Sequence, residues 1–195
     1  MAGLLPRPTP AAPGIRAEEC WLIPFREPPR PRSLRARVRW TGSRLTVRYV
    51  LEGELDDLVL PAAALVPRRQ DGLWQASCFE AFLSCPSQSG YREINLAPAG
   101  HWAAYFFEAP RQGMRLEAGL DQLDWKTHRV PGHFAIRFSV RPDNLGLEGT
   151  PLRLGLCAIL KRQDGEREFW ALHHPSAGPD FHHPAGHLLE LSDRS

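Results

Sequence analysis

Short segments in which apolar and polar residues alternate, separated by turns rich in glycine and proline, dominate this sequence. In residues 34–40, for example, apolar residues alternate with Arg35, Arg37 and Arg39. A period of two is typical of strands that bury one face and leave the other in solvent. No segment carries a long helical period, so the pattern predicts an all-β fold.

Alternating segments recur at short and regular spacing along the chain. We expect strands at residues 34–40, 45–51, 58–60, 78–83, 91–96, 102–107, 125–130, 133–140, 152–160, 167–172 and 188–191, with residues 20–25 as either a first strand or an edge piece. Turn-forming residues separate several of them, as at 86–90 and 98–100. A series of roughly nine to eleven short strands predicts an antiparallel β-sandwich or jelly roll.

The chain length and charge limit the number of domains and the classes of partner. With 195 residues, we expect a single domain over residues 15–195, preceded by a flexible, proline-rich tail at 1–14. Hydrophobic residues make up 43% of the chain, which is ordinary for a protein that buries a core. The net charge of +2 gives no electrostatic reason to expect a nucleic acid as partner.

The spacing of the cysteines and the length of the apolar runs indicate whether to expect a metal or redox site, a membrane span or a secretion signal. Cys20, Cys78, Cys85 and Cys157 are far apart and form no CxxC pair, so no zinc or redox motif is predicted. No run of residues approaches the length of a membrane span, and the start of the chain does not resemble a secretion signal. We therefore expect a cytoplasmic protein with free thiols and no membrane partner.

Residues 72–114 concentrate aromatic and polar side chains, with two of the six Trp and four of the nine Phe in the chain. In the predicted hairpin 78–96, we expect Phe82 to pair with Tyr91. Glu80 then lies opposite Glu93, and directly opposed residues point to the same face of a sheet. This face carries Cys78, Glu80, Phe82, Tyr91, Glu93 and Asn95.

A strand face that mixes carboxylates, an amide and aromatic rings favours a sugar-like ligand. Two opposed carboxylates repel each other by up to about 1 kcal/mol. The hydroxyls of a sugar can bind both of them, while its C–H face packs on aromatic rings. The candidate ligand-binding residues are Trp74, Glu80, Glu93, Asn95, Trp102, Tyr105 and Trp170.

A resemblance to a known family rests on three stretches: LWQASCFEAFL, YREINLAPAGHWAAYFF and FWALHHPSAGPDFHH. They resemble the DOMON-like group of bacterial proteins, which is related to family-9 carbohydrate-binding modules. The resemblance covers most of the chain and is clearest at 73–107 and 168–183. It implies a β-sandwich that binds a sugar or haem. It also implies that Trp74 and Trp170 clamp a terminal sugar, with Glu80 as its hydrogen-bonding carboxylate.

Two alternatives would add a cofactor, although we expect none. Five of the eight histidines lie within 173–187, and imidazoles suit zinc, copper or nickel. They are His173, His174, His182, His183 and His187. Haem would need axial ligands such as His and Met, and Met114 is the only methionine beyond the first residue.

Two further alternatives concern the class of function. Glu80 and Glu93 have the residue types of the acid and base in glycoside hydrolysis, although no nucleophile elbow, phosphate loop or dinucleotide fingerprint is present. The second alternative is a protein-interaction module that uses the arginine-rich strand 34–40 or a sheet edge. A non-catalytic module that binds a carbohydrate or a sugar-containing metabolite remains the favoured hypothesis.

Overall fold

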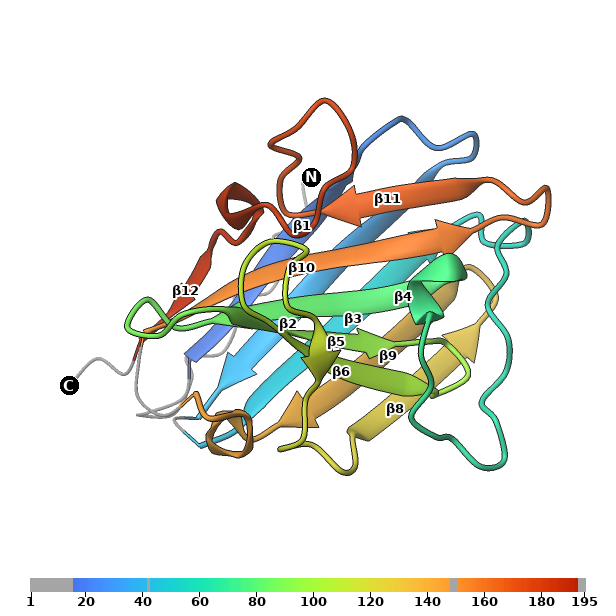
Figure 1. Cartoon of the computed structure of the whole chain (residues 1–195). Helices are drawn as coiled ribbons and strands as arrows, with labels where there is room; N and C mark the ends of the chain where they lie inside the picture. Colours follow the sequence, from blue (N-terminus) through green and yellow to red (C-terminus); the bar gives the residue numbers. More distant parts are fainter. Residues whose placement is uncertain (1–15, 42, 148–150, 193–195) are drawn as a thin grey trace, which may run out of the picture.

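The computed structural model describes residues 16–41, 43–147 and 151–192, so the tail expected at 1–14 lies outside the described residues. Twelve strands form an antiparallel β-sandwich (Figure 1), which confirms the predicted fold class. The strands are β1 Arg16–Pro24, β2 Arg32–Trp40, β3 Leu45–Gly53, β4 Cys78–Ser84, β5 Tyr91–Leu96, β6 Trp102–Phe107, β7 Arg115–Leu116, β8 Asp124–Val130, β9 His133–Val140, β10 Leu152–Lys161, β11 Arg167–Ala171 and β12 Leu189–Leu191. Short 3₁₀ helices lie at Leu73–Gln75 (η1), Pro142–Leu145 (η2) and Pro184–Gly186 (η3).

The strands form two sheets that share β1. The first sheet has the order β1-β2-β3-β9-β8, and the second has the order β7-β6-β5-β4-β10-β11. Residues 16–22 of β1 pair with β2, whereas Ile23 and Pro24 pair with β11 of the second sheet. Strand β12 pairs with the beginning of β10. One edge of the sandwich is therefore closed by a strand that crosses from one sheet to the other.

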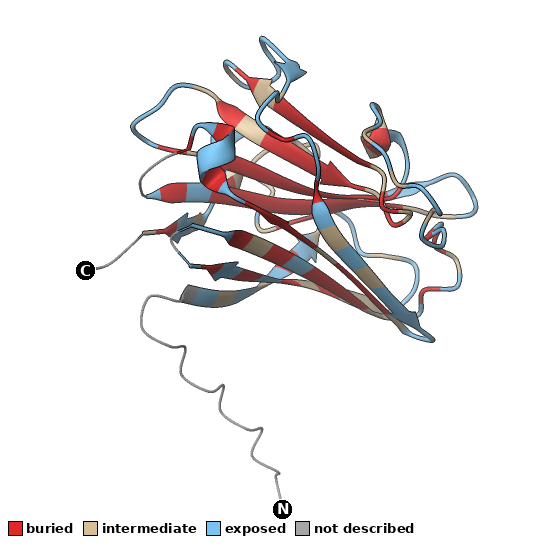
Figure 2. Cartoon of the chain, turned by 90° about the horizontal axis from the view of Figure 1, so that it is seen from below, coloured by how far each residue is buried: buried red, intermediate tan, exposed pale blue. Residues whose placement is uncertain are grey.

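The main core lies between the two sheets, as the buried residues in Figure 2 show. Phe79 on β4 is fully buried there, with its ring centroid 5.4 Å from that of Tyr49 and 5.7 Å from that of Phe134. The Tyr49 hydroxyl donates a 2.6 Å hydrogen bond to the main-chain carbonyl of Glu80. Apolar packing and this cross-sheet hydrogen bond fix the position of the central strand β4.

Most predicted strands agree with the structure, and two differences have simple causes. The predictions at 91–96, 102–107 and 133–140 match β5, β6 and β9. The predicted strand at 58–60 is wrong, because Leu58 forms only an isolated bridge to Arg162 and Pro61 then ends the segment. Strand β7 was not predicted, since its two exposed residues carry no alternating pattern.

The pairing of β4 with β5 differs from the prediction by two residues. Phe82 lies opposite Glu93 rather than Tyr91, and Glu80 lies opposite Asn95. Strand β4 continues through Ser84, which moves the turn toward the C-terminus. Because the shift is even, the same side chains still share one face of the sheet.

Two sequence expectations concern thiols and membrane spans. The four cysteines form no disulfide, and three of them are buried. In the described part of the chain, the structure contains no helix of the length and hydropathy needed to cross a membrane.

Candidate ligand-binding site

The outer face of the second sheet carries a buried cluster separate from the main core. Apart from Leu73 in η1, its members lie on strands, where they alternate with residues that face the core. They are Leu73, Cys78, Phe82, Tyr91, Ala103, Tyr105, Phe107, Cys157 and Ala171. Apolar side chains on an outer face need a cover, which is provided here by η1 and the segment that follows β11.

The segment that follows β11, residues 172–187, covers this face with histidine rings and is called the covering segment below. The His182 ring centroid lies 5.2 Å from that of Phe82 and 5.1 Å from that of Phe107. His187 stacks on Phe82 at 5.4 Å. His187 also lies directly over Gly155, where an added Cβ atom would be 2.3 Å from the imidazole Cδ2. The absence of a side chain at Gly155 therefore lets this segment approach the sheet.

Replacing Gly155 with alanine is expected to displace His187 and loosen the covering segment, because the new methyl group would occupy the position of the ring. We expect a loss of about 1–3 kcal/mol in the free energy of unfolding. Urea unfolding and proteolysis within 172–187 would measure both effects. Gly178→Ala is the matched control, since nothing lies within 4 Å of its added Cβ. Equal stability of the two variants would contradict the prediction.

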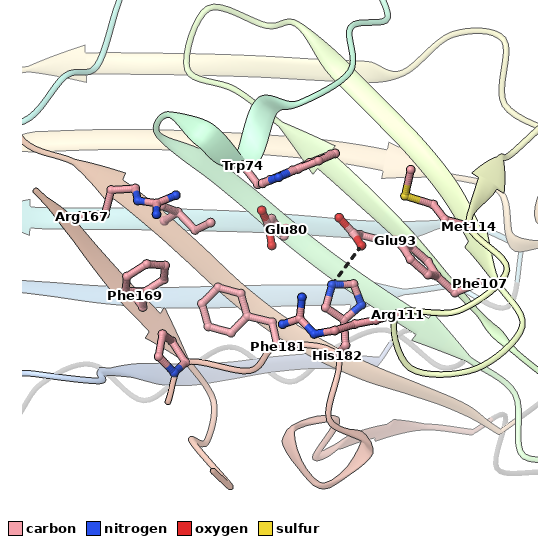
Figure 3. Close-up of a pocket in the computed structure, with 12 residues that line it drawn as sticks. Trp74, Glu80, Glu93, Phe107, Arg111, Met114, Arg167, Phe169, Phe181 and His182 are labelled. Atoms are coloured by element: carbon pink, nitrogen blue, oxygen red, sulfur yellow. Dashed lines mark ion pairs between the residues drawn. The ribbon is translucent and has the colours of Figure 1, made fainter. Parts of the chain in front are cut away.

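A cavity of about 350 Å³ opens on this face between η1, the loop after β6, the start of β11 and the covering segment (Figure 3). Its volume falls in the range of small-molecule sites. Aromatic rings form much of its wall, and two carboxyls reach it from β4 and β5. The cavity is lined by Trp74, Glu80, Glu93, Phe107, Arg111, Met114, Ile159, Arg167, Phe169, Pro179, Phe181 and His182.

Glu80 lies at the floor of the cavity and is only 3% exposed. Its Oε2 accepts a 3.5 Å hydrogen bond from the thiol of Cys157, while its Oε1 has no hydrogen-bond partner among the described residues. Burial, followed by the nearby charge of Glu93, raises the pKa of the Glu80 carboxyl. Burial also raises the pKa of Cys157, so the thiol stays protonated and can donate.

Glu93 is held by partners on two sides. Its Oε1 accepts a 2.7 Å hydrogen bond from the Asn95 amide, and its Oε2 lies 3.9 Å from Nε2 of His182. Burial raises the pKa of Glu93, whereas burial and Arg111 lower the pKa of His182 to about 4. A neutral His182 can accept a hydrogen bond at Nδ1 from the Tyr91 hydroxyl, 2.7 Å away. The other nitrogen, Nε2, then carries the proton and faces Glu93.

Two guanidiniums complete the polar lining, and both belong to exposed residues. Arg111 donates a 2.9 Å hydrogen bond to Asp180, and Arg167 lies 5.5 Å from the ring centroid of Phe169. The arrangement offers buried hydrogen-bond acceptors below, aromatic faces at the sides and cationic donors at the rim. It can hold a small molecule that is both hydroxylated and partly apolar.

Solved structures of carbohydrate-binding proteins are similar to this chain over most of its length. A candidate carbohydrate-binding protein from Bacteroides uniformis is 15% identical, with 89% of this chain and 84% of that chain covered and a TM-score of 0.63. A family-9 carbohydrate-binding module from Caldicellulosiruptor kristjanssonii, in complex with cellotriose, is 16% identical, with coverages of 92% and 84% and a TM-score of 0.59. A family-9 module from that organism, in complex with glucose, is 14% identical, with 85% of this chain and 81% of that chain covered and a TM-score of 0.50.

The fold is that of family-9 carbohydrate-binding modules. No family model matches the chain, and no curated protein matches it. At this low identity, the likeness establishes the architecture, and the ligand has to be inferred from the chain's own side chains.

The structure brings five of the seven candidate residues to the outer face within this fold. Trp74, Glu80 and Glu93 line the cavity directly. Tyr105 lies against Trp74, with ring centroids 5.9 Å apart, and Asn95 is bonded to Glu93. These last two side chains are fully buried and support residues that reach the cavity.

The structure places Trp102 and Trp170 on the opposite face of the sheet, in the main core. Trp170 is 2% exposed, and its Nε1 donates to Glu168. Trp102 packs beneath the guanidinium of Arg69, 4.6 Å from its ring centroid. Neither tryptophan lines the cavity, because strand alternation points them toward the facing sheet.

Other lining residues were absent from the sequence-based candidates. Strand alternation could have identified Phe169 and Phe107, because it places each of them on the outer face. Phe181 and Arg111 carried no such signal, because they lie in loops without periodicity.

The histidines and Met114 were the basis of the two cofactor alternatives. Among the described residues, no group of three or more His, Cys, Asp or Glu side chains is arranged to hold a metal ion. His183 caps η3 by accepting from the Ala185 amide, and His174 bonds the Ile23 carbonyl. Met114 and His182 both line the cavity, and the haem alternative stays a prediction.

Proposed function

We propose that this chain binds a carbohydrate or a sugar-containing metabolite in the cavity without transforming it. The main support is the buried Oε1 of Glu80, which has no partner among the described residues and belongs to a side chain that lines the cavity. A buried acceptor without a hydrogen bond is costly, and a ligand hydroxyl would satisfy it. The solved family-9 modules with cellotriose and glucose support the same ligand class.

The lining residues fit distinct roles in this proposal. Trp74 would pack against the C–H face of a sugar ring, with Phe181 as a further aromatic wall. Glu80 and Glu93 would accept hydrogen bonds from adjacent hydroxyls. Membership of the DOMON-like group of bacterial proteins and a cytoplasmic location belong to the same proposal and rest on the sequence alone.

Replacing Trp74 with alanine tests the site. The aromatic contact should be lost, weakening binding about 30-fold, or about 2 kcal/mol. Stability should change little, because Trp74 is only partly buried and lies outside the main core. Glucose and cello-oligosaccharides would be titrated by calorimetry after a thermal-shift screen of sugars.

Trp21→Ala is the matched control, because Trp21 is 58% exposed and lies on β1, away from the cavity lining. Equal binding by the wild type and the Trp74 variant would exclude this cavity as the sugar site. The absence of binding by any sugar in the screen would remove the support for carbohydrate as the ligand.

A glycoside-processing enzyme is the second candidate, favoured by two carboxyls with raised pKa at one cavity. A general acid in glycoside hydrolysis needs such a raised pKa. Turnover of chromogenic glycosides that disappears in Glu80→Gln would support this candidate over simple binding.

A further inference from the structure

Two arginines at the rim of the cavity bear on the class of ligand. We propose that the sugar carries an acidic group, a carboxylate or a phosphate, which Arg167 and Arg111 bind. This inference rests on the proposed function and narrows it. The hydroxylated part of the ligand would lie over Glu80 and Glu93, with the acidic group toward the guanidiniums.

Arg167 is exposed at the start of β11 and has no ion pair with any other described residue in the structure. It lines the cavity and also a second hollow of about 330 Å³, and Phe169 and Pro179 are shared by both. A guanidinium at this junction can reach a group on either side. It offers several N–H donors in a planar arrangement that matches a carboxylate or phosphate.

Arg111 reaches the cavity from an unusual backbone conformation. With a φ of 60°, it is the only non-glycine residue in the left-handed region in the described part of the chain. It follows Pro110 in a tight turn closed by the Gln112 amide and the Ala109 carbonyl at 2.9 Å, and this turn position favours glycine. Such conformations cost energy and concentrate at functional sites, which supports a role for this side chain.

The charges of the lining residues differ between the rim and the floor. The rim carries two guanidinium groups, whereas burial raises the pKa of the Glu80 and Glu93 carboxyls and so disfavours their charged forms. Asp180 pairs with Arg111 in an exposed contact, which contributes little stability and can be exchanged. A neutral sugar would leave the Arg167 guanidinium to water and Arg111 paired with Asp180, whereas an acidic group would gain charge-assisted hydrogen bonds from both.

The ends of the cavity therefore favour different groups. Glu80 is 3% exposed and offers a hydrogen-bond acceptor at the floor, while Arg167 and Arg111 are exposed at the rim (Figure 3). This polarity would orient an acidic sugar in one direction. It would also disfavour a ligand whose negative charge has to lie at the floor, beside the carboxyls.

Calorimetric titration of matched sugars tests this proposal. The ligands are glucose, glucuronate and glucose 6-phosphate, and then cellobiose and cellobionate. We expect at least one acidic sugar to bind about tenfold more tightly than its neutral counterpart, and the better of the carboxylate and phosphate ligands identifies the group. Arg167→Gln and Arg111→Gln should each reduce the ratio between the affinity for the acidic sugar and the affinity for its neutral counterpart.

Arg153→Gln is the charge-matched control, because Arg153 is exposed on β10, pairs with Glu190 and does not line the cavity. It should keep the advantage of the acidic sugar. Equal affinity for acidic and neutral sugars, or an advantage that survives in both rim variants, would overturn the inference while leaving the proposed function intact. Failure of every sugar to bind the wild type would instead overturn the proposed function.

Discussion

Glu80→Gln should stabilise the unliganded protein at alkaline pH and weaken ligand binding about 100-fold. Measured at pH 9, above the raised pKa of about 8 at which the Glu80 carboxyl ionises, the binding loss corresponds to two charge-assisted hydrogen bonds of about 1.5 kcal/mol each. Glutamine keeps the shape of the side chain but carries no charge. The variant therefore separates the contribution of the carboxylate to binding from its cost to the fold.

The pH dependence follows from the raised pKa of Glu80 in the folded state. Below the pKa that the Glu80 carboxyl has in the unfolded chain, this carboxyl is protonated in both states and does not lower the free energy of unfolding. As the pH rises, the Glu80 carboxyl ionises first in the unfolded chain. The free energy of unfolding then falls by about 1.4 kcal/mol for each pH unit between the pKa of this carboxyl in the unfolded state and its pKa in the folded state. This loss is complete only above the pKa of the folded state, so the gain from Glu80→Gln should grow between about pH 5 and pH 9.

Thermal unfolding from pH 5 to pH 9 would measure this gain, with calorimetry for the ligand. Glu54→Gln is a suitable control, because Glu54 is exposed on the surface and pairs only loosely with Arg30 at 3.7 Å. Its effect should be small at every pH. A Glu80 variant that is no more stable at pH 9 than at pH 5, relative to the wild type, would contradict the argument.

Phe79→Ala is expected to lower the free energy of unfolding by about 3–5 kcal/mol, because removing a large ring from a closed core loses burial and leaves a cavity. Phe79 is fully buried and contacts rings on the facing sheet. Urea unfolding would measure the change. A loss of this size is a large fraction of the stability of a typical domain, so expression of the variant should also fall.

Phe106→Ala provides the comparison for this prediction. Phe106 lies on β6 in a partly exposed position, with the guanidiniums of Arg92 and Arg115 over its ring. Its removal should cost about 1 kcal/mol or less. A larger loss for Phe106 than for Phe79 would contradict the assignment of the main core.

The fold was predictable because a single simple pattern repeats through the chain. Alternation at 91–96 and 133–140 gave strands that match the structure, since half-buried strands need that pattern. The faces of β4 and β5 were also predicted correctly, although the pairing of Phe82 was wrong. Alternation fixes which residues share a face, whereas the turn between the strands fixes their register.

The site was predictable only where strands form it. Glu80 and Glu93 were found because β4 and β5 present them on one face. Trp170 was selected as an aromatic ring for the ligand, and the resemblance made it a clamp, but its cross-strand partner Ala158 belongs to the core face. Phe181 and His182 reach the cavity only through contacts between segments far apart in the sequence, which no local pattern encodes.

The covering segment also affects when the cavity can form during protein synthesis. The carboxyls and Trp74 leave the ribosome well before Phe181 and His182, which complete the wall. Strand β4 likewise has to wait for its neighbour β10, which lies far along the chain. A nascent chain therefore exposes the outer face with its apolar cluster until residues 172–187 have been synthesised, and this interval is when chaperones would be needed most.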